Sequence, residues 1–175
     1  MSQKGPTFAE LVADCRVSAV HLETRDVYGV VEEDEDFAAW KKGKRYELSD
    51  QASWWNGFHQ TVADAVARGV VFRRARVVSE PVTDYIRYEH SCTPQNIAAG
   101  EEVRWLPRRM ASDLLLPGND LWIFDERVAR FGLFDGNGRF LEDVMERDGD
   151  VIERHSAAFD AMWERAIPHD EYKIR

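Results

Sequence analysis

The chain has 175 residues, 44% of them hydrophobic, which fits one folded domain rather than a disordered tail. Its formal net charge of −9 opposes nonspecific attraction to nucleic acid, so direct nucleic-acid binding is not expected. No apolar run approaches the roughly 18 residues that a membrane span needs, and the N-terminus lacks the apolar core of a signal peptide. Two widely separated cysteines, Cys15 and Cys92, indicate buried thiols in a reducing cytoplasm rather than a disulfide or metal framework.

The first 50 residues predict two helices and a strand. Residues 7–10 read Thr-Phe-Ala-Glu, the pattern of a capping box at the start of a helix. Weak alternation over 19–24 predicts a strand, and the acidic run over 32–36, followed by apolar residues and lysines, predicts a second helix. We expect residues 1–50 to form a helical and β-strand extension that packs on the rest of the chain.

The middle of the chain predicts a long helix followed by alternating strands and helices. Asp50 can cap a helix over 51–68, which Gly69 closes. We then expect a strand, two short helices, a second strand and a loop, over 70–78, 82–91, 93–100, 103–106 and 108–112 respectively.

The last third predicts a small antiparallel unit and a closing helix. Residues 135–138 read Asp-Gly-Asn-Gly, a strong turn signal between two strands. We expect three strands and a helix, over 121–125, 128–134, 140–145 and 151–166. The whole order predicts one α/β domain over 1–175, in which a mixed sheet is flanked by helices. Its core would span 51–166, and 167–175 would form a tail.

One segment resembles a motif of the phospholipase D superfamily. Residues 118–125 read Gly-Asn-Asp-Leu-Trp-Ile-Phe-Asp, and the superfamily pattern is His-x-Lys-x-x-x-x-Asp, whose final aspartate corresponds to Asp125. The Gly-Val-Val-Phe-Arg run over 69–73 and the Gly-Glu-Glu-Val-Arg run over 100–104 resemble two further strands of such domains. The resemblance covers roughly 51–166. It implies a phospholipase D-like half domain and, by analogy with one-half members, a homodimer.

The same resemblance argues against the usual chemistry of that fold. Phospholipase D enzymes attack phosphorus with a histidine, but Gly118 stands at the histidine position and Asp120 at the lysine position. Metal-ligand spacings, a glycine-rich phosphate loop and a serine nucleophile motif are also missing from the sequence. We therefore expect a pseudoenzyme with no cofactor and no metal.

The whole chain also resembles an actinobacterial family of unknown function. The similar segments lie over 8–11, 76–88, 96–109 and 167–172, in addition to the motif strand. Genes of such families commonly sit beside helix-turn-helix regulators, so the resemblance implies a helix-turn-helix protein as partner. It implies no activity and no catalytic residue.

The best candidate site is the arginine-rich middle of the chain, where all seven cations over 70–119 are arginines. Arginine forks suit phosphate or carboxylate, and strand ends in α/β sheets gather binding residues. The candidate ligand-binding residues are Arg74, Arg76, Asp84, Tyr85, Arg87, Tyr88, Arg104, Arg108, Arg109 and Asp125. The alternative is a purely structural network of buried ion pairs, formed by Arg76, Arg104, Glu80 and Asp84.

Three functional hypotheses follow from the sequence. The first is a non-catalytic regulatory or interaction module that acts with a helix-turn-helix regulator and binds a small anionic ligand. The second is a phosphodiesterase or nucleotidyl-type enzyme with non-standard catalytic residues. The third is an acidic antitoxin-like or DNA-mimic binder, which the net charge favours.

Overall fold

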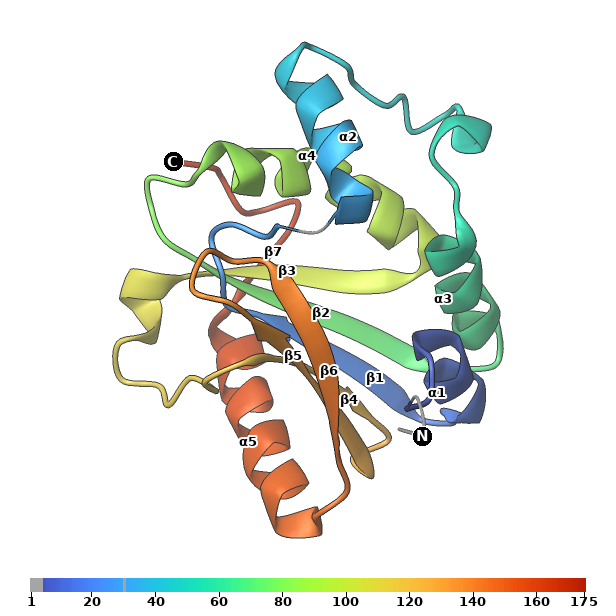
Figure 1. The fold of residues 1–175 in the computed structure, drawn as a ribbon, viewed down its shortest axis with the longest axis vertical. Helices are drawn as coiled ribbons and strands as arrows, with labels where there is room; N and C mark the ends of the chain where they lie inside the picture. Colours follow the sequence, from blue (N-terminus) through green and yellow to red (C-terminus); the bar gives the residue numbers. More distant parts are fainter. Residues whose placement is uncertain (1–4, 30) are drawn as a thin grey trace.

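The computed structural model describes residues 5–29 and 31–175 and contains a seven-stranded sheet with helices on both faces (Figure 1). The strands are β1 (Ser18–Glu23), β2 (Val71–Val78), β3 (Glu101–Pro107), β4 (Asp120–Phe124), β5 (Val128–Phe134), β6 (Phe140–Glu146) and β7 (Ile167–Pro168). Their order is β6-β5-β4-β1-β2-β3-β7. Strands β1, β2 and β3 run parallel, and the other neighbours pair antiparallel. The predicted mixed α/β sheet flanked by helices is confirmed.

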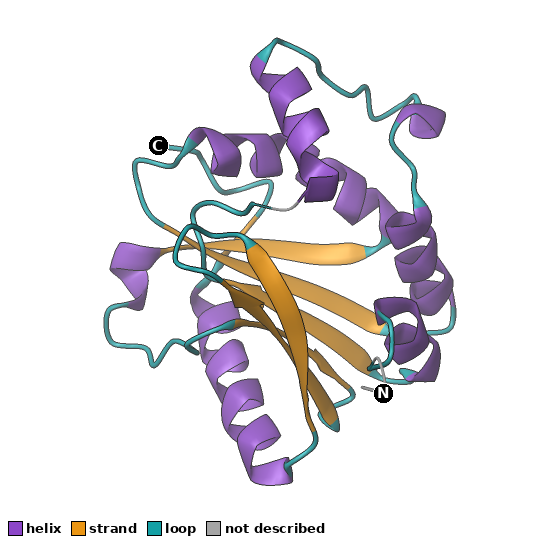
Figure 2. Cartoon of the chain, in the orientation of Figure 1, coloured by secondary structure: helices purple, strands orange, loops and turns teal. Residues whose placement is uncertain are grey.

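The five α-helices of the described ranges divide between the two faces of the sheet (Figure 2). They are α1 (Phe8–Asp14), α2 (Val31–Lys41), α3 (Gly57–Ala67), α4 (Asp84–Ala99) and α5 (Gly149–Arg165). Helix α5 packs on one face, while α1, α3 and α4 lie over the other (Figure 1). Within 5–29 and 31–175, none of these helices has the length and apolar character needed to cross a membrane.

The two faces of β2 differ in what they bury. On the α5 side, Ala75 and Val77 are fully buried against Phe159 and Met162 in a continuous apolar core. On the other side, Phe72 packs under α1 and α3, but the next two positions on that face are arginines. Because side chains alternate along a strand, one face of β2 is dry and the other turns polar toward its carboxyl end.

Several local predictions are confirmed by the hydrogen bonds of the structure. Thr7 and Glu10 form the predicted capping box of α1, and the acidic run lies in α2 as expected. The turn over 135–138 is held by Asp135, whose carboxylate accepts from Asn137 N at 2.8 Å and Arg139 N at 2.9 Å. Strand β5 has the predicted bounds. Strand β1, from the segment predicted as an extension, lies in the middle of the sheet between β4 and β2.

The long helix predicted over 51–68 was wrong at its start. Residues 51–53 form a short 3₁₀ turn, and α3 begins only at Gly57. The Asp50 side chain makes no capping hydrogen bond, whereas the Asn56 side-chain oxygen Oδ1 accepts from Phe58 N and His59 N. The helix therefore starts where a side chain satisfies its first free N–H groups.

The two short helices predicted over 82–91 and 93–100 form one helix, α4, with Pro94 inside it. Proline removes one backbone N–H, but the helix continues across that position, and the Thr93 hydroxyl donates to the Glu89 carbonyl at 2.8 Å just before it. The segment predicted as a loop over 108–112 contains a 3₁₀ turn, Arg108–Ala111. The start of the predicted tail forms β7, which pairs with β3.

Asp125 joins the end of β4 to the start of β1. Its carboxylate accepts from the backbone N–H groups of Arg16, Val17 and Ser18 at 2.8, 2.7 and 3.0 Å, and from the Cys15 thiol at 3.0 Å. Burial acts to raise the pKa of Asp125, but these hydrogen bonds hold it well below its usual range. The terminal aspartate of the motif strand is therefore a structural anchor for the central strand.

We predict that Asp125→Asn lowers the free energy of unfolding by about 2 kcal/mol, because a neutral amide cannot accept all four hydrogen bonds. Asparagine tolerates the φ of 51° found at this position, so the backbone is not strained by the change. Chemical denaturation measures the effect, and Asp14→Asn at an exposed aspartate is the control. Equal stability of the two variants would contradict the anchoring role.

Candidate functional site

A cavity of about 1050 Å³ lies over the polar face of the sheet. It is lined by residues of β1, β2, β4 and β5 below, by α4 on one side, and by the segment before α3 on another. The β5–β6 hairpin contributes further lining residues. Ligand pockets of proteins commonly measure about 300–1000 Å³, so this cavity can hold a whole small organic molecule.

Strand register explains which side chains form the floor of the cavity. Paired residues across β5, β4, β1 and β2 form one transverse row: Arg130, Trp122, His21 and Arg74. One step further toward the carboxyl end of β1, Glu23 pairs with Arg76. Neighbouring residues in a row lie on the same face of a sheet, so a charged and aromatic floor follows directly from this register.

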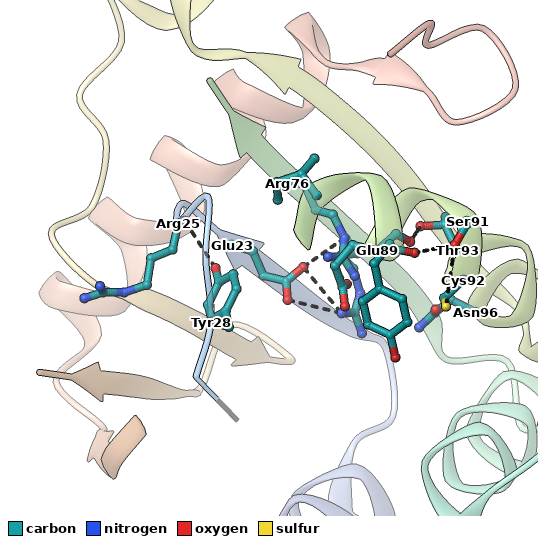
Figure 3. Close-up of polar contacts among 12 residues, drawn as sticks. Glu23, Arg25, Tyr28, Arg76, Glu89, Ser91, Cys92, Thr93 and Asn96 are labelled. Atoms are coloured by element: carbon teal, nitrogen blue, oxygen red, sulfur yellow. Dashed lines mark hydrogen bonds and ion pairs between the residues drawn. The ribbon is translucent and has the colours of Figure 1, made fainter. Parts of the chain in front are cut away.

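Ion pairs join this floor to the elements around it. The Glu23 carboxylate lies 3.4 Å from Arg74 Nη1 and 3.1 Å from Arg76 Nε. Arg74 also pairs with Glu101 of β3 at 3.1 Å, and Arg76 pairs with Glu89 of α4. Figure 3 shows Glu23, Arg76 and Glu89 converging from three different elements. Buried guanidinium groups need such partners, because an unpaired buried charge is strongly destabilising.

The ionisation of Glu23 is tied to these pairs. Burial acts to raise the pKa of Glu23, but the Arg76 and Arg74 guanidinium groups outweigh it and lower the pKa to about 2. Glu23 is therefore charged at neutral pH and serves both arginines at once.

The β4 side of the cavity holds a second polar group centred on Asp120. Its carboxylate accepts from the Thr24 N–H at 2.9 Å, the Thr24 hydroxyl at 2.7 Å and the Tyr28 hydroxyl. Burial raises the pKa of Asp120, against the effect of these hydrogen bonds. On the neighbouring strands, Arg130 pairs with Asp143.

Aromatic rings surround the polar floor. His21 and Trp122 stack within it, with ring centroids 4.0 Å apart and an interplanar angle of 12°. Burial lowers the pKa of His21 well below its usual value, so the ring is neutral at pH 7. The other aromatic lining residues are Phe8, Tyr28, Tyr46, Trp54, Trp55, Phe58, Tyr85, Tyr88, Phe134 and Phe140. Flat faces are therefore available on several sides of a bound molecule.

Some polar atoms of the lining residues are buried without a hydrogen-bond partner among the residues described. They are nitrogen atoms: His21 Nδ1, Trp54 Nε1, Arg74 Nε, Arg76 Nε and Arg130 Nε. The Arg76 atom lies within ion-pair distance of Glu23 but outside hydrogen-bond geometry. These atoms are covered by neighbouring protein groups, so they are unsatisfied polar atoms within the floor and not contact points for a ligand.

Four of the predicted site residues meet in this cavity: Arg74, Arg76, Tyr85 and Tyr88. Asp84 and Arg87 are also on α4 but are exposed and do not line it. Arg104 faces the opposite side of the sheet, where its guanidinium donates to the Trp163 carbonyl at 3.0 Å and lies 4.4 Å from the Trp163 ring centre.

The remaining predicted residues lie outside the cavity lining. Arg108 donates to the Ser79 hydroxyl at 3.2 Å and to backbone carbonyls, and Arg109 pairs with Glu80 at 3.1 Å. Asp125 lies near the opposite end of β1, as described above. The expected convergence of all these groups at the strand ends was therefore wrong. Arg104 points away, Asp84 and Arg87 are exposed, and the remaining three bind local partners.

The alternative prediction was a network of buried ion pairs. Such a network exists, but most of its residues differ from those predicted. Arg76 is buried and paired, but its partners are Glu23 and Glu89 instead of Glu80 and Asp84. Sequence reasoning missed Glu23 because the pairing of β1 with β2 is not visible in either strand alone. The alternation of His21 and Glu23 on one face of a predicted strand was the available signal.

Comparison with protein families shows the family to which the chain belongs. A family model described as "Domain of unknown function (DUF6879)" matches residues 6–174. The chain belongs to this family. The predicted membership of a family of unknown function is thus confirmed. Among curated proteins, none matches the sequence.

Solved structures show the fold. Nuc from Salmonella typhimurium, a phospholipase D family member, has a TM-score of 0.52 and 10% identity, over 95% of this chain and 93% of that one. NucT from Helicobacter pylori has a TM-score of 0.53 and 12% identity, over 91% and 87%. The archaeal chromatin protein TrmBL2 has a TM-score of 0.50 and 16% identity, over 91% of this chain and 48% of TrmBL2. The DUF6879 chain therefore spans about half of TrmBL2, and its predicted phospholipase D-like fold is confirmed.

The motif positions of that fold can now be placed in the structure. Gly118 is exposed and has no neighbouring atom within 4 Å of where a Cβ would lie. Asp120, at the lysine position, is buried and lines the cavity. Within the part of the chain described, no cluster of three or more His, Cys, Asp or Glu side chains could hold a metal ion.

We predict that Glu23→Gln lowers the free energy of unfolding by about 3–5 kcal/mol, because it leaves two buried arginines short of a counter-charge. The folded-state pKa of about 2 lies below the ordinary value of 4.5. The stabilisation by Glu23 is thus complete above pH 4.5 and is lost as the pH falls toward 2. Chemical denaturation at several pH values should show the gap between variant and wild type closing over this range.

The control is Glu102→Gln, at an exposed glutamate of β3, which we expect to change stability by about 0.5 kcal/mol or less. A stability gap for Glu23→Gln that stayed constant from pH 6 to pH 2 would contradict the ion-pair account.

Proposed function

We propose that this DUF6879 chain is a non-catalytic, ligand-responsive module that acts with a helix-turn-helix regulator. The observation that carries the proposal is the cavity of about 1050 Å³, in which aromatic walls surround a floor of charged side chains. Largely apolar concave sites with a few convergent polar groups are the usual form of small-molecule binding sites.

The motif strand supports a non-catalytic role. A phospholipase D-type reaction needs a histidine nucleophile, and Gly118 has no side chain that could attack phosphorus. Asp120 places a carboxylate where the family motif has a cation, and its bonds to Thr24 and Tyr28 leave it facing the cavity as an acceptor. A negative group at this position repels a phosphodiester instead of stabilising it.

The structural relatives support a link to DNA-binding proteins. TrmBL2 is a chromatin protein that binds DNA, and the match with this chain covers 48% of it. A fold of this kind therefore occurs as one part of a larger DNA-binding protein. A net charge of −9 opposes direct binding to DNA. We therefore assign the DNA contacts to a separate helix-turn-helix partner.

Contacts between the cavity floor and the C-terminal segment offer a route by which a ligand could act on a partner. The Arg76 guanidinium lies 5.4 Å from the ring centre of Trp105. Trp105 in turn donates to His169 Nδ1 at 3.1 Å and stacks on Tyr172, with ring centroids 5.5 Å apart. A shift of Arg76 on ligand binding would thus reach residues that follow β7.

Equilibrium dialysis against a metabolite extract of the host organism tests ligand binding. We predict that wild-type protein enriches at least one small compound and that Gln95→Trp enriches it less, because an indole at this lining position of α4 obstructs part of the cavity. The control, Arg87→Trp, makes the same change at an exposed position of α4 and should behave like wild type. Failure of the wild type to enrich any compound, or recovery of the compound in a chemically altered form, would contradict the proposal.

Size-exclusion chromatography with light scattering tests the partner. We predict that the chain forms a stable complex with a helix-turn-helix regulator of its host, and that Gln95→Trp weakens this complex while Arg87→Trp does not. The same measurement on the chain alone reports whether it is a monomer or the homodimer implied by analogy. Separate elution of the two proteins at tens of micromolar would count against the regulatory role.

A further inference from the structure

We propose that the cavity binds a flat, uncharged heteroaromatic compound with oxygen or nitrogen acceptors on its ring edge, of the class of nucleobases and nucleosides. This inference rests on the proposed ligand-responsive function and specifies the chemistry of the ligand.

The charges of the cavity argue against an anion. Its described lining contains three guanidinium groups, on Arg74, Arg76 and Arg130, and five carboxylates, on Glu23, Asp36, Glu89, Asp120 and Asp143. Each guanidinium is already paired with at least one carboxylate. A phosphate or other anion would add negative charge to a site that already has an excess of acidic groups, in surroundings of low dielectric constant.

The nitrogen donors of the lining favour a ligand with acceptors. Arg74, Arg76 and Arg130 line the floor of the cavity, and Trp54 lines its edge. Arginine and tryptophan nitrogens can only donate, so a ligand that contacts them supplies acceptor atoms while remaining uncharged.

The rings of the lining require a flat partner. The stacked His21–Trp122 pair belongs to the floor, and Trp54 and Trp55, with ring centroids 5.6 Å apart, stand at the edge near α3. Stacking of one nucleic-acid base on an aromatic side chain contributes about 1–3 kcal/mol. A heteroaromatic ring with acceptors on its edge satisfies the floor donors and the aromatic walls together, which an aliphatic molecule cannot do.

The size and the polar wall leave room for a sugar beside the base. A base alone would fill only part of the roughly 1050 Å³. Helix α4 lines the remaining side with the polar residues Glu89, Gln95 and Asn96. A carboxylate and amides can bind the hydroxyl groups of a ribose, while the excess of acidic groups disfavours a 5′-phosphate.

Isothermal titration calorimetry with adenosine, guanosine, cytidine and uridine, and with their 5′-monophosphates, tests this class on the full chain. We expect at least one nucleoside to bind, and its monophosphate to bind at least about tenfold more weakly, because the phosphate adds negative charge beside the acidic groups of the lining. Arg74→Lys keeps the charge beside Glu23 and Glu101 but replaces the planar guanidinium fork. It should weaken nucleoside binding by about tenfold, which is the worth of about one hydrogen bond to a charged group.

The matched control is Arg104→Lys, the same change on the opposite face of the sheet, which should bind like wild type. Thermal unfolding of both variants establishes that they are folded. The inference is overturned if no nucleoside binds, if a monophosphate binds as tightly as its nucleoside, or if Arg74→Lys and Arg104→Lys bind nucleoside equally. If dialysis still enriches another compound, the ligand class fails and the proposed function stands. If dialysis enriches nothing either, both fail.

Discussion

The sharing of Glu23 between Arg74 and Arg76 is the interaction on which the site depends. It places one carboxylate from β1 between two guanidinium groups of β2, and Glu89 and Glu101 complete the pairing from α4 and β3. A sheet face that carries these charges cannot be covered by close apolar packing of a helix. Helices α3 and α4 pack on apolar residues at the edges of this face, and the charged residues between these contacts form the floor of the cavity.

The opposite face of the same strands shows the contrast. There Ala75 and Val77 of β2 pack directly against α5, and a continuous core fills the space between helix and sheet. The two faces of the sheet thus differ in packing, as the alternation of side chains along β2 dictates. Helix α5 packs directly on the sheet, whereas the cavity lies between the sheet and the α3–α4 layer.

Much of this arrangement could be predicted from local patterns. The alternation over 70–78 put Arg74 and Arg76 on one face, and the order of elements put the helix that carries Tyr85 and Tyr88 next in the chain. The floor could not be completed, because the contributions of His21, Glu23, Trp122 and Arg130 depend on strand register. Register follows from long-range pairing of β1 with β2 and β4, which no single segment encodes. Helix boundaries failed where one capping side chain, at residue 56 instead of 50, decided the start.

The phospholipase D-like fold keeps its architecture here while the motif positions take other roles. The terminal aspartate, Asp125, fixes the entrance to β1, and Asp120 lines the cavity in place of a lysine. Retention of a scaffold with altered groups at the reactive positions is consistent with a fold that hosts different functions.

Nuclear magnetic resonance of the arginine Nε–H groups tests the central claim most directly. In protein labelled with ¹⁵N, we expect the Nε–H signals of Arg74 and Arg130 to shift when the compound enriched by dialysis is added, because both guanidinium groups line the cavity. The signal of Arg104, on the other face of the sheet, should not move. Binding of the compound without any change at Arg74 and Arg130 would contradict the assignment of this cavity as the ligand site.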